Sequence, residues 1–592
     1  IMLCWVSFLN PTYNLLHLES IMWQNQENIL SSIREELKNI VLTAINKATE
    51  EKLIGSLNIP EYNIQKPDQK EYGDLSLSLP LVLSRQAKMP PKRIAEIIVQ
   101  FIDKKDRIDR IEIAGPGFIN FFLKANWLSE IIRSIQERGK DYGKVSSRNG
   151  EKALVEFVSA NPVGPLNVVS ARAASIGDSI VNLLNSIGYK AEREFYVNDA
   201  GGQVWTFAKS INARYQQLFG KDVPFPEDGY HGDYITDLAR EIMDEHGDKF
   251  LKTPETERLE AFRKIGLKKI LDGQKQDLYD FGVEFDLWAS EKAVRESGKM
   301  DEVLRIIHDN NFSYKKDGAI WFKATFFSDD RDRVIVKSNG EVTYIVPDLA
   351  YHLDKSHRGF KKVIDLWGPD HHGYIPRMKS GMQALGLPHD WLEILMVQQV
   401  NLLRGGEAVR MSKRAGQFVT LKELIDDLAK QVGRQFAVDV ARFFFQMRST
   451  NAHLDFDMDL AVQQAESNPV FYVQYAHARI CSIFKQKDEK GVKTMESVDL
   501  SLLKEPEEAD LIKKLADFPD TVYDSAINMA PHSITRYVQE LASVFHSFYN
   551  KCKVLDSENI ELSNARLVLV DCVRTVLRNG LALLGISAPE SM

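Results

Sequence analysis

The first regular hydrophobic pattern begins at Met22 and predicts an amphipathic helix that continues to about residue 48. Its apolar face consists of Ile29, Ile33, Leu37, Ile40, Val41 and Ala44. A further helix is predicted over residues 90–102 and a strand over residues 117–123. A polar, turn-rich stretch at 141–152 then interrupts the pattern. These features predict a small α+β domain over residues 22–124.

An alternation of strands and helices follows. The pattern predicts a strand over 153–159, a helix over 168–189 and a strand over 191–197, and strands resume at 340–346, 361–367 and 391–400. The charged, mostly helical stretch between about 205 and 335 is interpreted as an insertion. This order predicts a doubly wound, Rossmann-like parallel sheet over residues 150–420, which would bind ligands at the carboxyl ends of its strands.

Beyond residue 420 the apolar positions follow helical spacing. One stripe consists of Leu421, Leu424, Ile425 and Leu428, and another of Ile534, Tyr537, Val538, Leu541, Val544, Phe545 and Phe548. Residues 421–592 are therefore predicted to form an all-α bundle, helical throughout. The fold class is thus multidomain α/β, with a small α+β domain before the parallel sheet and a helical domain after it.

Composition narrows the compartment and the partners. The 592 residues carry a formal charge of −8, which argues against adhesion to nucleic acid by charge alone, so an RNA contact must use local basic patches and shape. The four cysteines, Cys4, Cys481, Cys552 and Cys572, form no C-x-x-C pair, as is typical of a reducing cytoplasm. No apolar run approaches the roughly 20 residues of a membrane span, so no membrane association is expected.

The segment 1–21 does not continue the pattern that follows it. Its apolar beginning lacks the basic residues of a signal peptide. We interpret 1–21 as a non-native or disordered extension and Met22 as the start of the protein.

Three segments carry candidate chemistry, and the first is "SANPVGPLNVVSAR" at 159–172. A predicted strand is followed by Asn161, Pro162 and Gly164, and a helix begins near Val168. Such a turn directs backbone N–H groups and a helix N-terminus at an anion. A strand–turn–helix with one glycine is also ordinary architecture, so this signal is weak by itself.

The second segment is "DLWGPDHHGYIPR" at 365–377. Asp370 follows a predicted strand, where an acidic side chain can bind a ribose hydroxyl. The adjacent His371 and His372 have no third ligand at suitable spacing, so no metal site is predicted.

The third segment is "VRMSKRAG" at 409–416, with the cations Arg410, Lys413 and Arg414 on a loop that ends in glycine. It is either a solvated basic loop or a clamp that neutralises a pyrophosphate leaving group.

Together, the three segments resemble the signatures of class I aminoacyl-tRNA synthetases, with "GPLNVVS" at the HIGH position and "RMSKR" at the KMSKS position. Further stretches narrow the resemblance to the arginyl-tRNA synthetase family: "EFVSANPVGPL", "FYVNDAGGQV", "TYIVPDLAYHLDK", "GPDHHGYIPRM" and "DVARFFFQMR". The resemblance covers the chain from Met22 to its end. It implies that residues 22–124 contact the tRNA elbow and that residues 421–592 bind the anticodon.

The resemblance also implies the reaction, which is ATP-dependent ligation of L-arginine to tRNA(Arg) through an arginyl-adenylate, with release of AMP and pyrophosphate. ATP would be a substrate carrying Mg²⁺ on its phosphates, with no metal bound by protein side chains alone. Activation would require tRNA, and the enzyme is expected to be a cytoplasmic monomer.

Site residues follow from the same resemblance. Glu156 and Asn161 would hold the α-groups of arginine, and Tyr344 and Asp348 would face its guanidinium. A carboxylate suits that role because it binds the planar guanidinium through two parallel charge-assisted bonds. Asp348 also follows Pro347 as a helix N-cap would, and the two roles are compatible. The residues implied in ATP binding are Ala160, Asn161, Pro162, Gly164, Pro165, Asn167, Val169, Ser170, Gly368, Asp370, Met411, Ser412 and Lys413.

The catalytic set would be Asn167, Ser170, Lys413 and Arg410, and here the chain departs from the family. Asn167 and Ser170 stand where the family has histidines that bond the ATP phosphates. We expect the Asn167 amide to donate to a phosphate and the Ser170 hydroxyl to contribute little. The alternative is a catalytically impaired, tRNA-binding relative of the same family.

Overall fold

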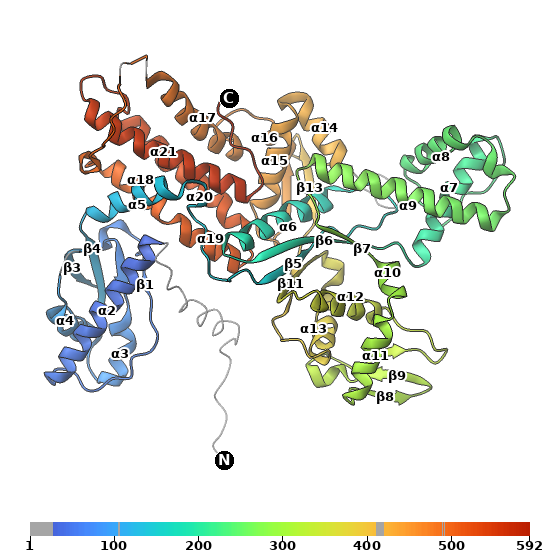
Figure 1. Ribbon diagram of the computed structural model, residues 1–592, viewed down its shortest axis with the longest axis horizontal. Helices are drawn as coiled ribbons and strands as arrows, with labels where there is room; N and C mark the ends of the chain where they lie inside the picture. The colour runs from blue at the N-terminus through green and yellow to red at the C-terminus, as the bar shows by residue number, and fades with distance from the viewer. Residues whose placement is uncertain (1–27, 105–106, 410–418, 488, 491) are drawn as a thin grey trace. The chain divides into compact units, whose positions relative to one another are not determined.

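The computed structural model describes residues 28–104, 107–409, 419–487, 489–490 and 492–592, which fall into two compact units (Figure 1). The first unit contains the described residues up to Ser147, together with Arg479–Asp520 and Leu541–Asn579. The second contains Arg148–Ala478, Thr521–Glu540 and Gly580–Met592. The predicted extension 1–21 lies outside the described residues.

The first unit contains a four-stranded antiparallel sheet with the order β1-β2-β4-β3. Its strands are β1 (Ile64–Gln65), β2 (Leu75–Leu77), β3 (Ile108–Ala114) and β4 (Phe118–Leu123). Helices α2 (Ile29–Glu50), α3 (Leu79–Ala87) and α4 (Pro91–Phe101) pack with this sheet, and α5 (Asn126–Arg138) follows it. The predicted helices and strand of this region are confirmed. The first helix begins after Asn28, whose side chain caps it by accepting from Leu30 N and Ser31 N.

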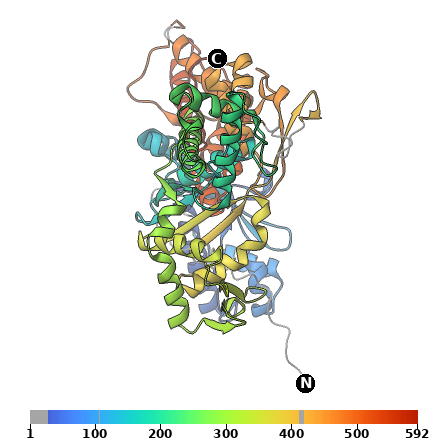
Figure 2. The ribbon, with the colours of Figure 1, turned by 90° about the vertical axis from the view of Figure 1, so that its right-hand side faces the viewer.

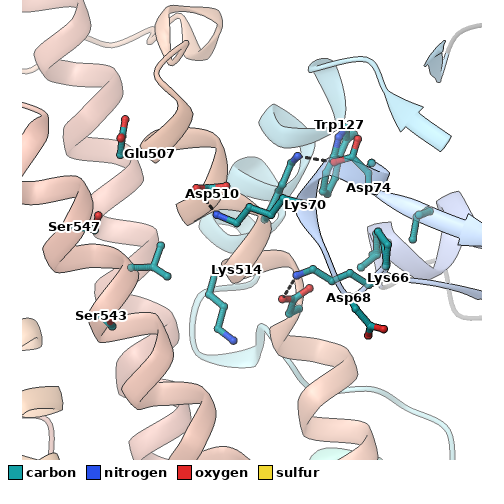
Figure 3. Close-up of a pocket in the computed structure, with 17 residues that line it drawn as sticks. Lys66, Asp68, Lys70, Asp74, Trp127, Glu507, Asp510, Lys514, Ser543 and Ser547 are labelled. Carbon is teal, nitrogen blue, oxygen red and sulfur yellow. Dashed lines mark hydrogen bonds and ion pairs between the residues drawn. The ribbon is translucent and has the colours of Figure 1, made fainter. Parts of the chain in front are cut away.

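Helical segments from the second half of the chain complete the first unit, including α18 (Pro506–Ala516) and parts of α17 (Pro469–Lys487), α19 (Phe518–Ile527), α20 (Pro531–Lys551) and α21 (Ile560–Leu583). A cavity of about 460 Å³ lies within this unit (Figure 3). Ion pairs join its walls: Lys66 to Asp517 at 2.7 Å, Lys70 to Asp510 at 2.6 Å and Lys513 to Asp74 at 2.6 Å. These pairs are partly exposed, so each stabilises the unit only weakly.

The second unit is built on a five-stranded parallel sheet with the order β12-β11-β5-β6-β7. Its strands are β5 (Lys152–Glu156), β6 (Lys190–Val197), β7 (Leu287–Ser290), β11 (Lys362–Trp367) and β12 (Leu392–Met396). The chain builds outward from β5 on one side, through β6 and β7, and on the other through β11 and β12. The predicted doubly wound sheet is therefore confirmed, and its topological switch point lies between β5 and β11, where this fold binds ligands.

Helix α6 (Val168–Ser186) follows β5, and one glycine allows its close packing. A Cβ on Gly177 would lie 2.2 Å from the ring of Phe157, a distance that no side chain tolerates. Deeper in the unit, the fully buried Arg442 of α15 (Arg434–Gln446) contacts Asp178 of α6 and the carbonyl of Leu584. Gly585 has φ of 65° and lies against this guanidinium, so glycine is required there as well.

Two strand predictions are corrected. Residues 340–346 were expected to be a strand, but Val342 forms only an isolated bridge and α12 (Ile345–His357) begins there. The β-branched run suggests a strand, whereas Pro347 and Asp348 occupy the first helical turn, where both residue types are favourable. Residues 391–400 are not one strand, because β12 ends at Met396 and β13 (Val400–Arg404) joins a separate sheet with β14 (Glu407–Ala408) and β15 (Leu454–Asp457).

The predicted insertion 205–335 is more varied than a helical block. It contains α8 (Asp233–His246), α9 (Glu255–Asp280), α10 (Glu291–Glu296), α11 (Lys299–Asp309) and most of α7 (Gly202–Leu218). Helices α7 and α9 lie side by side in both views (Figure 1, Figure 2). The span also contains the edge strand β7 and a three-stranded antiparallel sheet of β8 (Ser313–Lys316), β9 (Ala319–Phe322) and β10 (Arg333–Val336).

The region beyond residue 420 is not helical throughout, because β15 pairs in parallel with β13. Its predicted apolar stripes are buried except for the half-buried Val544. The stripe that begins at Leu421 lies on α14 (Leu421–Val432), which Thr420 and Glu423 start with a reciprocal capping box.

Candidate active site

The chain turns sharply where β5 ends. Val158 has φ of 68° and Ser159 φ of 39°, conformations that cost energy for residues with a side chain and that concentrate at functional sites. The Ser159 hydroxyl donates to Glu156 Oε1 at 2.9 Å and accepts from the Tyr196 backbone N–H at 3.1 Å. This serine therefore ties the strained turn to the ends of β5 and β6.

Two helices of the predicted insertion hold the loop that follows. Gln274 of α9 donates from Nε2 to the carbonyls of Asn161 and Gly164, at 3.2 and 2.8 Å. Tyr234 of α8 donates to the carbonyl of Val163 at 2.8 Å. Gln274 is 1% exposed, so it holds the loop from the buried side. The backbone carbonyls of Asn161, Val163 and Gly164 are thus held by the helices, which leaves the opposite face of the loop for a ligand.

Helix α6 begins behind this loop, and Asn167 is its N-cap. Asn167 Oδ1 accepts from the backbone N–H groups of Val169 and Ser170, at 3.0 and 2.9 Å, and from the Ser170 hydroxyl at 3.3 Å. The oxygen is therefore occupied by the helix, and the side-chain NH₂ group is the part of Asn167 that can reach a ligand. The Ser170 hydroxyl is directed at Asn167 Oδ1, so it supports the helix cap and does not itself face a ligand phosphate.

The described chain resumes beside Asn167 after residues 410–418. Thr420 forms an isolated antiparallel bridge with Asn167, and Leu421 N donates to the carbonyl of Leu166 at 2.8 Å. The predicted residues Arg410, Met411, Ser412 and Lys413 lie outside the described residues.

The end of β11 contributes the second predicted segment. Gly368 follows the strand and Asp370 lies in the short 3-10 helix η5 (Pro369–Tyr374). Asp370 is exposed. Because β11 and β5 are adjacent and parallel, this segment and the loop after β5 share the carboxyl edge of the sheet.

A cavity of about 310 Å³ lies at the N-terminal end of α12, and we call it the Asp348 cavity. Tyr344, which is 85% exposed, and Asp348 both line it, so the structure brings together the two residues expected to face a guanidinium. Asp348 Oδ2 accepts from the Tyr374 hydroxyl at 2.6 Å, which fixes the carboxylate. The other lining residues are Tyr196, Asn198, Ala200, Gly201, Gly202, Gln203, Glu291, Arg295 and Pro347.

Sequence reasoning missed a second carboxylate in this cavity. Glu291 is the first residue of α10, directly after β7, and its Oε1 accepts from Arg295 Nε at 2.8 Å. The sequence signal was weak, because a glutamate at the start of a helix is common for reasons of helix polarity alone. Arg295 also lines the cavity and forms an ion pair with Glu291, so Asp348 supplies the net negative charge, and the two carboxylates together supply the planar acceptors that suit a cationic, planar ligand group.

The charge of Asp348 is sensitive to its surroundings. Burial raises its pKa from 3.8 to about 6, and the hydrogen bond from Tyr374 opposes that rise. The nearby carboxylates Glu291 and Glu156 raise the pKa further, and His352 lowers it. A ligand cation in the Asp348 cavity would stabilise the ionised form.

Asn161 and Glu156 lie between this cavity and the turn. Asn161 is exposed, and its Oδ1 accepts from Asn198 Nδ2 at 3.0 Å. Glu156 is buried, and its Oε2 accepts from Lys355 at 2.5 Å. Since Ser159 holds the other oxygen, both oxygens of Glu156 already have partners.

A second cavity, of about 390 Å³, lies on the N-terminal α+β part of the first unit. Two aromatic side chains in its wall are exposed, Tyr72 by 44% and Phe118 by 38%. The amide and hydroxyl side chains there are Asn63, Gln65, Gln69, Ser76, Ser78 and Asn120. Exposed rings beside amide groups are the means by which proteins stack on and read unpaired RNA bases.

Within the described residues, no three or more His, Cys, Asp and Glu side chains group as metal ligands, His371 and His372 included. None of the described helices is both long and apolar enough to cross a membrane.

Family models match three parts of the chain. They are the "Arginyl tRNA synthetase N terminal domain" at residues 29–123, the "tRNA synthetases class I (R), catalytic domain" at 131–443 and the "DALR anticodon binding domain" at 473–592. The catalytic model covers the sheet, the turn after β5 and the Asp348 cavity.

Relatives match along nearly the whole length. The chain is 48% identical to the arginine–tRNA ligase of Caldanaerobacter subterraneus over 570 residues, which are 96% of this chain and 100% of the relative. It is 44% identical to that of Bacillus subtilis, covering 95% of this chain and 100% of the relative. These proteins carry the same activity name, and none of them supports the alternative of a catalytically impaired relative.

Solved structures agree with this assignment. A putative arginyl-tRNA synthetase from Campylobacter jejuni superposes with a TM-score of 0.71 at 33% identity, over 79% of this chain and 100% of that one. The Thermus thermophilus arginyl-tRNA synthetase has the same fold, with a TM-score of 0.73 at 20% identity over 94% of this chain and 100% of that one. The chain therefore belongs to the arginyl-tRNA synthetase family of class I aminoacyl-tRNA synthetases.

Proposed function

We propose that this chain ligates L-arginine to tRNA(Arg) with the Asp348 cavity as its amino-acid site. The observation that carries the proposal is the pair of carboxylates, Asp348 and Glu291, in one cavity at the carboxyl ends of β6 and β7. A guanidinium binds such a pair through several charge-assisted hydrogen bonds. The ammonium of lysine is a point charge and cannot match the planar arrangement, so the cavity favours arginine.

The α-carboxylate and α-ammonium of arginine are assigned to the region between the Asp348 cavity and α6. Asn161 is exposed there and already held by Asn198, so it can bind these groups at little entropic cost. Glu156 is buried, and Ser159 and Lys355 already bond its two oxygens. It therefore influences the α-ammonium of arginine through its charge and not through a direct hydrogen bond.

ATP is assigned to the loop after β5 and the end of β11. The adenosine lies against Gly368 and Asp370, and the phosphates lie against the N-terminus of α6 and the Asn167 amide. The residues assigned along the loop are Ala160, Pro162, Gly164, Pro165, Val169 and Ser170. Met411, Ser412 and the cations Arg410 and Lys413 belong to the segment that reaches Thr420, whose bridge with Asn167 supports their place beside the phosphates.

The chemistry follows from this arrangement. The arginine carboxylate attacks the α-phosphorus of ATP in line, arginyl-adenylate forms, and pyrophosphate leaves. Lys413, Arg410 and the helix N-terminus stabilise the negative charge that develops on the departing phosphates. The terminal adenosine hydroxyl of tRNA then attacks the arginyl carbonyl and AMP leaves.

The N-terminal α+β part is assigned to the tRNA elbow, where the cavity beside Tyr72 and Phe118 receives an unpaired base. Replacement of Phe118 by alanine should raise the KM for tRNA about tenfold, because one base–aromatic stack stabilises binding by roughly 1–3 kcal/mol. The KM for arginine should not change.

Magnesium, the oligomeric state and the compartment complete the proposal. Mg²⁺ binds the ATP phosphates instead of a cage of side chains. The enzyme acts as a monomer in the cytoplasm, where the buried thiols of Cys481, Cys552 and Cys572, which form no disulfide, stay reduced.

Arginine-dependent exchange between ATP and pyrophosphate, measured with and without tRNA(Arg), tests the proposal. We expect exchange with arginine alone among the twenty amino acids, and only when tRNA is present. Charging of tRNA should show the same selectivity. Binding of tRNA without either reaction would support the impaired relative instead.

A further inference from the structure

Helix α12 lies against the parallel sheet through an unusually polar face. Its side chains at 351, 352, 355 and 358 all contact carboxylates of three neighbouring strands. Tyr351 and Arg358 bond Glu194 of β6, and Lys355 bonds Glu156 at the end of β5 and Asp365 of β11, at 2.5 and 3.1 Å. Because Asp348 lies one turn earlier, these contacts determine where its carboxylate points.

His352 makes two hydrogen bonds that together fix its protonation state. Its Nδ1 lies 2.8 Å from the backbone carbonyl oxygen of Asp348, and its Nε2 lies 2.8 Å from Asp365 Oδ2. A carbonyl oxygen only accepts hydrogen bonds, so Nδ1 must carry a proton. An ionised carboxylate also only accepts, so Nε2 must carry one as well. Both bonds therefore require the doubly protonated, cationic imidazolium.

The other way to satisfy both bonds is a neutral Asp365 that donates to Nε2. Lys355 argues against it, because its fully buried ammonium donates to Asp365 Oδ1 at 3.1 Å. Burial raises the pKa of Asp365, and Lys355 lowers it through its charge and its hydrogen bond, so this cation favours the ionised carboxylate. Asp365 is therefore an acceptor for both neighbours.

The charges around His352 fit a buried cation. Carboxylates face this region from β11, β5, β6 and α10, whereas Lys355 is the cation that shares Asp365 with it. Tyr374 donates to Asp348, with Arg377 of α13 (Ile375–Ala384) over its ring, and Lys299 of α11 pairs with Asp354 elsewhere on the helix. The carboxylates are Asp365, Glu156, Glu194 and Glu291, together with Asp348 itself.

We propose that His352 is a positioning residue for arginine, a buried imidazolium that fixes the first turn of α12 and keeps Asp348 ionised for the substrate guanidinium. The proposal rests on the proposed function in one respect, since it takes Asp348 as the guanidinium partner. His352 does not touch the substrate. It acts through the Asp348 carbonyl, which it holds, and through its positive charge, which opposes the carboxylates nearby.

Replacement of His352 by glutamine keeps a hydrogen-bond donor and removes the charge. Without the cation, Asp348 should become protonated at a pH about one unit higher. The KM for arginine should therefore rise about threefold at pH 6.5 and about eightfold at pH 5.5, with almost no rise at pH 8.5, while kcat changes by less than about twofold. His357→Gln is the matched control, because His357 lies on the same helix with half of its side chain exposed.

The pH dependence separates charge from mere packing. A variant that is damaged only in its packing would raise the KM by the same factor at every pH, and this result would overturn the proposal. If instead Asp348→Asn leaves the KM for arginine unchanged, the proposed amino-acid site fails. The protonation state of His352 is then still decided by the next measurement.

Nitrogen NMR of the wild-type enzyme labelled in its 13 histidines tests the imidazolium without any variant. One ring should be doubly protonated at pH 8, where an unperturbed imidazole is neutral. Where His352→Gln folds, its spectrum should lack that signal. The absence of any doubly protonated ring at pH 8 would overturn the proposal.

Discussion

The sharpest test of the amino-acid site is Asp348→Asn. The change removes one negative charge and keeps the shape of the side chain, including an oxygen that can accept from Tyr374. The asparagine amide has N–H donors where the guanidinium needs an acceptor. The variant should therefore lose one strong charge-assisted bond and leave a guanidinium donor unpaired.

The structure sets the size of the loss. Asp348 is partly buried, and burial with the nearby carboxylates raises its pKa to about 6 against the opposing effects of Tyr374 and His352, so water screens its charge only in part. Removal of one partner from a buried charge pair costs roughly 2–5 kcal/mol. Glu291 remains in the cavity, so we expect the middle of that range, about 3–4 kcal/mol. At 1.36 kcal/mol per factor of ten, kcat/KM for arginine should fall by about 100- to 1,000-fold.

The assay is arginine-dependent ATP–pyrophosphate exchange with saturating ATP and tRNA, repeated with lysine. The preference for arginine over lysine should shrink with the same change. Asp354→Asn is the matched control, since Asp354 lies on the same helix, pairs with Lys299 and lines no part of the Asp348 cavity. Tyr374→Phe should cost only about 0.5–1.5 kcal/mol, the net value of an ordinary hydrogen bond.

A kcat/KM for arginine within about threefold of the wild type in a folded Asp348→Asn variant would refute the reasoning, because it would show that no substrate charge reaches this carboxylate. An equal loss in Asp354→Asn would point to damage of α12 as a whole.

Two further predictions concern other parts of the site, and a third concerns the effect of Asp348 on stability. Asn167→Ala should cost about 2–4 kcal/mol of transition-state stabilisation in pyrophosphate exchange and Ser170→Ala less than about 1, since Ser170 only supports the cap; equal losses would contradict this. Lys413→Ala should lower kcat more than it raises the KM for arginine, and a pure KM effect would place Lys413 in the amino-acid pocket. Asp348→Asn should raise the melting temperature at pH 8. The pKa of Asp348 is about 6 in the folded chain and 3.8 in the unfolded chain, so its stabilising contribution is present below about pH 4 and is lost as the pH rises through 6. An unchanged or lower melting temperature would count against this prediction.

Much of the architecture was predictable from local pattern. Strands β5 and β11 are bounded by turn residues and are mostly apolar, as buried parallel strands are, with Asp365 as the one interruption in β11, whereas β6 begins with charged residues and becomes apolar only near its end. The spacing of apolar residues predicts helices α6 and α14, and the capping residues Asn167 and Thr420 indicate where they begin. The strand prediction for 340–346 was wrong because its β-branched residues pack into the core equally well from a helix. Only Pro347 and Asp348 indicated that a helix begins there.

The candidate site divides in a similar way. The sequence supplied Asp348, Tyr344 and Asn167 through their motifs. It could not supply Glu291 or Gln274, because each contacts the site from an element far along the chain and neither stands in a pattern of its own. It also could not show that Ser159 and Lys355 occupy both oxygens of Glu156, since hydrogen-bond saturation depends on distances and not on spacing.

The sequence by itself determined the family, most of the strands and helices in their order along the chain, and the candidate residues for arginine and ATP. These depend on local periodicity and on short motifs, both of which lie along one stretch of chain. The tertiary structure decided the second carboxylate of the Asp348 cavity, the use of the Asn167 oxygen as a helix cap and the two hydrogen bonds of His352. Each of these arises where residues distant in sequence, or the side chain and backbone of one turn, meet at about 3 Å, and only folding sets that distance.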